Sequence, residues 1–207
     1  MKLYYAPGAC SLSPHIVARE GKIAIELSRV TFDGAKRTTA EGEDFFVVNP
    51  KGGYVPALRL DSGDVLSEGV AIIHYLVDQS SVTLMPEKGS LVYYRALEWM
   101  TYISSEIHKG FSPLFNPTLS DELKGQTKEK IMSRLAYVES ELGKHQYLVG
   151  DSFTAPDAYL YTILRWTKQF GMSLEEYANI TAYMARVESR EAVKQALKEE
   201  GLETFYV

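Results

Sequence analysis

The chain has 207 residues, of which 45% are hydrophobic and 24% charged, and its formal net charge is −5. This length fits one large domain or two small ones with a substantial core, and the composition is that of an ordinary globular protein. The acidic balance without a basic cluster argues against a nucleic-acid surface, and no apolar run approaches the roughly 18 residues of a membrane helix. The N-terminus opens directly into a strand-like segment, so we expect no signal peptide. A single cysteine fits a reducing compartment, which predicts a cytoplasmic protein.

Short β-type runs alternate with helical ones over the first 80 residues. The patterns predict strands over 2–6, 26–31, 57–60 and 65–66, helices over 11–20 and 68–77, and a loose helical stretch before residue 57. Asp61-Ser62-Gly63-Asp64 is a turn typical of a hairpin between the last two strands. The order β-α-β, then β-β-α, predicts a partly parallel sheet with an antiparallel edge.

Strand signals end near residue 80. Residues 80–89 read as a linker, and apolar residues at helical spacing then predict long helices over 92–107, 131–142 and 159–170 and one or two more over 174–200. Thr154-Ala155-Pro156-Asp157 matches a capping box with Asp in place of Glu, which predicts a structural helix start. This half of the chain is therefore predicted to be an all-helical bundle.

Cys10, the only cysteine, follows a turn with Pro7 and Gly8 between a predicted strand and a predicted helix. This layout places its thiol, and the hydroxyls of Ser11 and Ser13, at a helix N-terminus. The unpaired amides and the helix dipole there favour negative charge, so the position biases the thiol toward thiolate. A free cysteine is also among the most buried residue types, so inert packing is the alternative.

A second segment with chemical potential contains the dipeptide Val55-Pro56 at the start of a strand, where proline is tolerated. A cis bond here would turn the N–H and C=O of Val55 outward, where they could pair with an extended peptide ligand. Spacing alone does not establish the cis form.

Ser67 and Glu68 open the helix predicted over 68–77. Ser67 could cap this helix, and its hydroxyl and the first backbone amides would then form a carboxylate site. Glu68 either complements the helix dipole or binds the ammonium group of a ligand, and both interpretations stay open.

The order of these motifs along the chain is more specific than any one of them. A βαβ-ββα segment of about 80 residues holds a thiol after its first strand, Val55-Pro56 before a later strand and Ser67-Glu68 at its last helix, and a helical half with the capping box follows. Together they resemble the glutathione transferase family over nearly the whole chain. The runs Ala9-Cys10-Ser11-Leu12-Ser13-Pro14-His15 and Ser105-Glu106-Ile107-His108-Lys109-Gly110 resemble the bacterial beta class most.

The resemblance implies an α+β fold of two domains. It implies a thioredoxin-like βαβ-ββα domain over 1–80 that binds glutathione, a linker over 81–88, and an all-α helical bundle over 89–207 that lines the electrophile site. It also implies a homodimer without nucleic-acid or membrane partners, and no cofactor, since glutathione is a co-substrate.

The resemblance further implies the roles of individual residues. Val55 and Pro56 meet the cysteinyl backbone of glutathione, Glu68 and Gly69 its γ-glutamyl end, and Lys36 or Arg37 its glycine carboxylate. The implied glutathione-binding residues are Lys36, Val55, Pro56, Ser67, Glu68, Gly69, Glu106 and Lys109. The implied catalytic residues are Cys10, Ser11, Tyr5 and His108.

The leading hypothesis for the reaction is conjugation of the glutathione thiolate to a small apolar electrophile, as in detoxification. Cys10, Ser11 and the helix N-terminus would stabilise the thiolate, with His108 and Tyr5 as proton or hydrogen-bond partners. Phe111, Phe115 and Trp166 are candidate apolar walls of the electrophile site, and plain core packing is the alternative.

Two rival hypotheses remain. Ser13 stands where a thioredoxin-type second cysteine would be, so Cys10 could reduce disulfides or peroxides only with glutathione as the second thiol. The fold also serves as a non-enzymatic binding module.

One departure from the family pattern concerns the loop before Val55. Gly53-Tyr54 looks like an insertion of about one residue, and we expect the glycines to absorb it because they tolerate unusual backbone angles.

Overall fold

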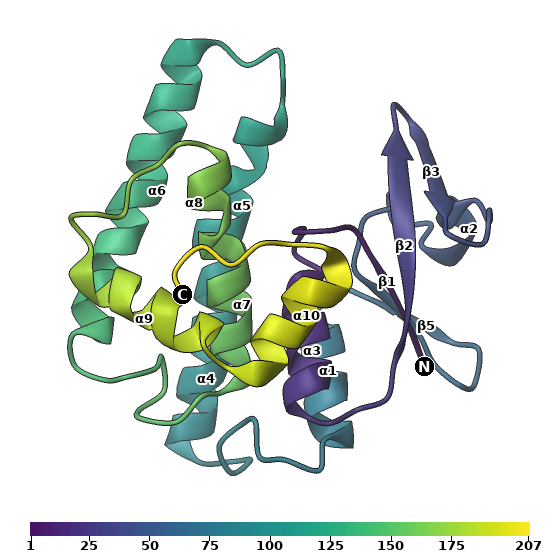
Figure 1. Cartoon of the computed structure of the whole chain (residues 1–207), viewed down its shortest axis with the longest axis horizontal. Helices are drawn as coiled ribbons and strands as arrows, with labels where there is room; N and C mark the ends of the chain where they lie inside the picture. Colours follow the sequence, from purple (N-terminus) through teal and green to yellow (C-terminus); the bar gives the residue numbers. More distant parts are fainter. The chain divides into compact units, whose positions relative to one another are not determined.

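The computed structural model describes residues 1–207, and their contacts divide them into two compact units (Figure 1). The first unit comprises residues 1–84 and 189–205, and the second comprises residues 85–188 and 206–207. The predicted boundaries at residues 80 and 89 stay a prediction, and the contacts add a C-terminal helix to the first unit. None of the helices combines the length and the apolarity that crossing a bilayer requires.

The first unit is built on a mixed five-stranded sheet in the order β3-β2-β1-β4-β5. Its strands are β1 (Lys2–Tyr5), β2 (Glu26–Asp33), β3 (Lys36–Thr39), β4 (Ala57–Arg59) and β5 (Val65–Ser67). Strands β1 and β2 run parallel, and every other neighbouring pair is antiparallel. The predicted partly parallel sheet with an antiparallel hairpin edge is confirmed, and β3 is an additional strand in the stretch that was expected to be loosely helical.

Helices cover both faces of this sheet (Figure 1). They are α1 (Leu12–Glu20), α2 (Phe45–Val48) and α3 (Gly69–Gln79). Helix α1 packs against both α3 and the C-terminal helix α10 (Glu191–Glu200). Since side chains alternate along a strand, Leu3 and Tyr4 point to opposite faces. Tyr4 joins a buried cluster with Val30, Phe45 and Ala57, so the short helix α2 closes that face.

The second unit is entirely helical, as predicted. It contains α4 (Leu91–Tyr102), a π-helical segment η1 (Ile103–His108), α5 (Lys109–Phe111), a 3-10 turn η2 (Ser112–Phe115), α6 (Asp121–Leu142), α7 (Ala155–Leu164), α8 (Trp166–Gln169) and α9 (Ala178–Glu188). The apolar stripe of α6 that the sequence predicts is buried along its length: Ile131, Leu135, Val138 and Leu142.

The capping box at the start of α7 is confirmed. The Asp157 carboxylate accepts the N–H and the hydroxyl of Thr154, each at 2.8 Å from Oδ2, and Oδ1 accepts the N–H of Leu148 at 3.0 Å. Tyr183 of α9 donates its hydroxyl to the carbonyl of Asp157 at 3.0 Å. Asp157 therefore joins the start of α7 to the preceding loop and to α9.

Two of the predicted helices are interrupted. The helix expected over 92–107 changes to π-helical geometry at Ile103, and the helix expected over 159–170 is divided between α7 and α8 next to Arg165. The apolar residues Trp99, Ile103 and Ile107 follow one another at steps of four, which is longer than the 3.6-residue α-helical turn and favours a locally wider helix. This widened turn carries Glu106 and His108.

Candidate functional site

Backbone and hydroxyl hydrogen bonds hold the turn between β1 and α1. Ala9 donates its N–H to the carbonyl of Ala6 at 3.0 Å, and the buried Ser11 hydroxyl both accepts the N–H and donates to the C=O of Ala6, each at 3.2 Å. Ser13 donates its hydroxyl to the carbonyl of Cys10 at 2.7 Å. Both serine hydroxyls thus fix the turn, and a role for Ser11 as a donor to a ligand thiolate stays a prediction.

The Cys10 thiol faces the segment that carries Val55. Its Sγ donates to the Val55 carbonyl at 3.3 Å. Burial raises the pKa of Cys10 to about 12, against the opposing effect of the backbone N–H groups of Cys10 and Ser11, while the Glu68 charge raises it further. The predicted bias toward thiolate is therefore wrong for the ligand-free chain, because loss of water outweighs the amides of the helix N-terminus.

Val55 and Pro56 lie at the end of a tight loop, and the peptide bond between them is cis, the form that spacing alone did not establish. Asn49 donates its side-chain amide to the Tyr54 carbonyl at 2.8 Å and accepts the N–H of Gly53 on its own carbonyl at 3.0 Å. Gly52 and Gly53 have φ of 105° and 61°, the unusual backbone angles that glycine tolerates, and the insertion itself stays a prediction.

Strand pairing brings three of the predicted segments to the same end of the strands of the sheet. Ala57 pairs with Tyr4 of β1 on one side and with Ser67 of β5 on the other, so the residues that flank these strands become neighbours. Gly69 lies against Pro56, with 3.7 Å between the Pro56 ring and the position of a Cβ on Gly69. The Cys10 turn, the cis-proline and the start of α3 therefore form one cluster.

The start of α3 differs from the prediction that Ser67 caps it. Ser67 is the last residue of β5, and Glu68, at φ 73°, occupies the N-cap position without a side-chain cap hydrogen bond. The carbonyl of Glu68 accepts the N–H of Ile72 at 3.0 Å, so its backbone begins the helix while its carboxylate is exposed. A non-glycine residue in the left-handed region is uncommon, and such residues concentrate at ligand sites.

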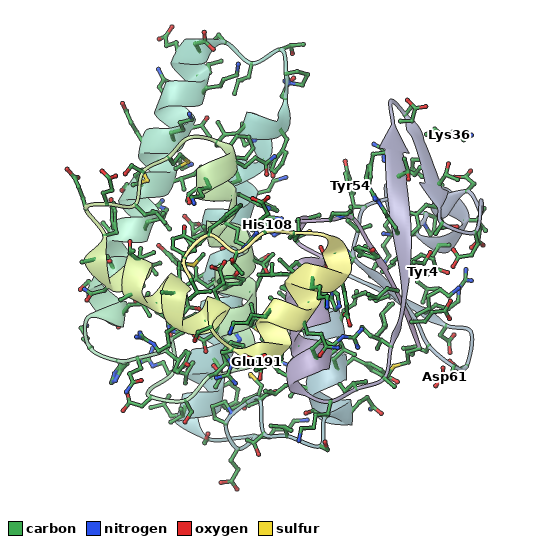
Figure 2. The ribbon with its side chains drawn as sticks, viewed as in Figure 1. Tyr4, Lys36, Tyr54, Asp61, His108 and Glu191 are labelled. Carbon is green, nitrogen blue, oxygen red and sulfur yellow. The ribbon has the colours of Figure 1, made fainter.

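Lys36 begins the edge strand β3 at the turn that follows β2 (Figure 2). Because β1 and β2 are parallel, this turn and the Cys10 turn both follow the C-terminal ends of their strands and lie at the same end of the sheet. Strand β2 extends four residues further than β1. Arg37 is committed to the turn itself, since it donates to the Gly34 carbonyl at 2.6 Å. Lys36 is exposed and therefore remains available to an anionic group.

Tyr5 ends β1 directly before the Cys10 turn, and its side chain is largely buried. Burial raises the pKa of its phenol, so the hydroxyl is protonated and can act as a hydrogen-bond donor.

In the second unit, His108 lies at the end of η1 (Figure 2). Its ring contacts those of Tyr159 and Trp166. Its Nδ1 shares a hydrogen bond of 2.7 Å with the Tyr159 hydroxyl, and its ring centroid is 5.1 Å from that of Trp166. Burial, with a smaller contribution from the Lys109 charge, lowers the pKa of His108 to about 4. The imidazole is therefore neutral at pH 7. Tyr159, which fixes its orientation, was not predicted, because it is 51 residues away in the sequence.

The residues beside His108 have different environments. Glu106 forms a salt bridge of 2.9 Å with Arg134 of α6, whereas Lys109 is exposed. Their predicted contacts with glutathione stay a prediction.

The three predicted wall residues contact one another through Trp166. The Trp166 ring lies 5.6 Å from that of Phe111 and 5.1 Å from that of Phe115, and Phe170 lies 4.9 Å from Phe115. Phe111 is fully buried, whereas Phe115 is 49% exposed. The cluster therefore has both a core side and an open side.

Comparisons with known proteins agree over nearly the whole chain. Family models described as the N-terminal and the C-terminal domain of glutathione S-transferase match residues 8–79 and 102–191. Glutathione S-transferase GstA of Escherichia coli O157:H7 is 44% identical over 204 residues, which cover 98% of this chain and all of that protein. A sphingomonad glutathione S-transferase solved in complex with glutathione is 44% identical with a TM-score of 0.91, and a bacterial beta class enzyme of Sphingomonas chungbukensis is 41% identical with a TM-score of 0.92; each match covers 98% of this chain and all of the other chain.

Proposed function

Because this chain belongs to the glutathione S-transferase family, we propose that it joins the thiol of glutathione to small apolar electrophiles, as in detoxification. The observation that carries this proposal is the cluster formed by the Cys10 turn, Val55-Pro56 and the start of α3 at the same end of the strands of the sheet. These segments offer backbone groups, a carboxylate and helix amides to a short peptide with charged ends.

In this proposal, glutathione binds along this cluster as an extended peptide. Its cysteinyl backbone pairs with Val55 beside Pro56, and the ammonium and carboxylate of its γ-glutamyl end meet Glu68 and the first amides of α3, with Ser67 adjacent. Lys36 takes the glycine carboxylate. The exposed carboxylate of Glu68 and the exposed ammonium of Lys36 support the two charged ends of this placement.

The chain would stabilise the glutathione thiolate mainly with groups that stay neutral. Protonated Cys10 and Tyr5 can each donate a hydrogen bond to a thiolate, and hydrogen bonding to the charged form lowers a thiol pKa. Glutathione has an ordinary thiol pKa near 8.5, so a decrease of about one or two units makes much of it thiolate at neutral pH. Neutral His108 can accept a proton or orient a donor.

The aromatic cluster of Phe111, Phe115 and Trp166 is the proposed electrophile surface of the helical unit. An apolar electrophile would pack on the exposed ring of Phe115. The nucleophilic thiolate forms a bond to the electrophilic carbon, and the leaving group departs with the electron pair of the broken bond. In an addition no group leaves, and the neighbouring atom, which keeps the electron pair of the broken bond, takes a proton instead.

A direct test measures both binding and turnover. Calorimetry should give a dissociation constant for glutathione below 1 mM, and a nitro-activated aryl chloride should be converted faster with enzyme than without it. Glu68→Gln should weaken glutathione binding at least tenfold, while Lys22→Ala, a change at a surface lysine away from the cluster, should not alter it. Absence of glutathione binding at 5 mM ligand would refute the proposal.

A second candidate function, glutathione-dependent reduction of disulfides, is favoured by the contact between Cys10 Sγ and the Val55 carbonyl. A glutathione bound along Val55 would have its sulfur near Cys10. Deprotonated Cys10 would attack the glutathione sulfur of a mixed disulfide and release the other thiolate; a second glutathione thiolate would then attack that sulfur, regenerating Cys10 and forming oxidised glutathione. Cys10→Ala would abolish this reaction and leave much of the conjugation.

We also propose that the chain forms a homodimer. Leu91, Val92 and Tyr94 of α4 are all exposed, and a soluble protein rarely leaves such large apolar side chains together without a partner. Light scattering after size-exclusion chromatography should give about 46 kDa, twice the mass of the 23.2 kDa chain.

A further inference from the structure

A carboxylate from the end of α10 reaches the turn that carries Cys10. Glu200 accepts the N–H of Gly8 on its Oε2 at 2.9 Å, and Gly8 lies two residues before Cys10. The Glu200 side chain is fully buried. Because a buried charge is costly unless donors surround it, the Gly8 amide and Glu200 stabilise each other.

The other oxygen of Glu200 is held by His15 of α1. His15 Nδ1 lies 2.9 Å from Glu200 Oε1, and its Nε2 lies 2.7 Å from Glu199 Oε2. The two nitrogens of the buried His15 ring therefore lie within hydrogen-bond distance of two different carboxyl groups. Arg19 also donates to Glu199, at 2.7 Å. His15 and Arg19 thus supply hydrogen-bond partners to the two neighbouring carboxyl groups.

The residues after α10 add an apolar contact to the same turn. Gly201, at φ 70°, ends the helix, and Leu202 then packs over Gly8, with 3.6 Å between a Leu202 methyl group and the position of a Cβ on Gly8. Gly8 itself has φ 71°, a conformation in which other residues are strained. A hydrogen bond to Glu200 and a packing contact with Leu202 thus hold the turn from outside.

The position of α10 does not depend on Glu200 alone. At the opposite end of the helix pair, Arg190 donates to both oxygens of Glu20, at 2.5 and 2.8 Å. A change at Glu200 can therefore release the Gly8 turn while α10 stays on α1.

We infer that Glu200 is a positioning residue for Cys10. It holds the Gly8 amide, and through this amide it keeps the turn in the conformation in which the Cys10 thiol faces the Val55 carbonyl; His15 orients the carboxylate. The relevance of this contact to catalysis rests on the proposed function, but the effect of Glu200 on the Cys10 turn can be measured without glutathione.

The test compares Glu200→Gln with Glu199→Gln, which removes the neighbouring carboxylate beside His15 and Arg19 but changes no partner of Gly8. Two properties are measured without glutathione: the rate at which iodoacetamide alkylates Cys10 between pH 7 and 10, and the hydrogen-exchange rate of the Gly8 amide by NMR. In Glu200→Gln, we expect alkylation at pH 9 to rise at least fivefold and Gly8 exchange at least tenfold. In Glu199→Gln, both should stay within twofold of the unchanged protein.

The hydrogen-exchange rate of the Ile23 amide distinguishes a local effect at Gly8 from a general loss of stability. This amide donates to the Ala18 carbonyl at the far end of α1. It should keep its exchange rate in both variants. Equal effects of the two variants, a matching increase at Ile23, or no change at Gly8 and Cys10 in Glu200→Gln would each overturn the inference. If Glu200→Gln does not fold, Glu200→Asp keeps the charge but shortens the reach, and the same increases are expected. Failure to bind glutathione would refute the proposed function, but the alkylation and exchange results would still test the role of Glu200.

Discussion

The thiol of Cys10 donates a hydrogen bond to the carbonyl of Val55, which precedes the cis-proline, over 3.3 Å. This contact joins two segments that are 45 residues apart, and it accompanies the rise of the Cys10 pKa to about 12. The resting state of the site therefore has a protonated thiol beside the proposed position of glutathione.

Cys10 should consequently be alkylated slowly in the folded protein. A free cysteine has a pKa of about 8.5, so at pH 8 the folded thiol should react at least about 100-fold more slowly than the same thiol in 8 M urea. The folded pKa exceeds the unfolded one, so the protonated thiol contributes stability below the unfolded pKa that is lost as the pH rises toward 12. An inflection of the folded alkylation rate below pH 9 would contradict this prediction.

His108 should make the protein sensitive to acid. Its pKa is about 4 in the folded chain and about 6.5 when unfolded, so the stability from the neutral ring is present above pH 6.5 and lost as the pH falls through 4. Between pH 7.5 and pH 5 this amounts to about 2 kcal/mol. Measured by urea unfolding, the free energy of unfolding should fall between pH 7.5 and pH 5 by about 2 kcal/mol less in His108→Phe than in the unchanged protein. An equal loss in both proteins would mean that His108 is not the group that titrates.

Glu68 should combine a structural cost with a binding role. Its φ of 73° favours glycine, so Glu68→Gly should keep or raise the free energy of unfolding, by up to about 1 kcal/mol. The same change removes the carboxylate, so the dissociation constant for glutathione should rise at least tenfold. Chemical unfolding and calorimetry measure the two effects separately, and unchanged affinity in Glu68→Gly would remove Glu68 from the proposed site.

Asp157 should be essential for the stability of the helical unit. Burial raises its pKa to about 6 despite the donors around it, and Asp157→Ala leaves the Thr154 and Leu148 amides without their acceptor. Each unpaired buried group costs about 1–3 kcal/mol, so we expect a loss of about 3 kcal/mol or more in urea unfolding. Thr154→Ser keeps the hydroxyl and should cost less than 1 kcal/mol. A similar loss in both variants would argue against this account.

Local patterns predicted those parts of the fold that depend on neighbouring residues. The hairpin around Asp61–Asp64, the stripe from Ile131 to Leu142 and the capping box are each encoded within a few turns of chain. Strand β3 was missed because Lys36–Thr39 is polar, as an edge strand can be when only its partner strand supports it.

Sequence motifs predicted which residues form the candidate site. They did not predict the properties that depend on the surroundings of those residues in the fold. Cys10, Val55 and Glu68 are found by their position relative to strands and helices. The protonation state of Cys10 depends on burial, and the orientation of His108 depends on Tyr159, so neither follows from spacing. Glu200 meets Gly8 across 192 residues, and no local pattern records this contact.

The pairing of α1 with α10 also orders events during synthesis. Residues His15 and Glu20 leave the ribosome long before Glu200 and Arg190 are translated. Until then, one face of α1 in the nascent first unit is uncovered, and His15 lacks both of its carboxyl partners. The thiol turn can acquire its final geometry only after the helical unit has been made. A nascent chain stalled after α9 would therefore expose the bare face of α1 to chaperones and proteases.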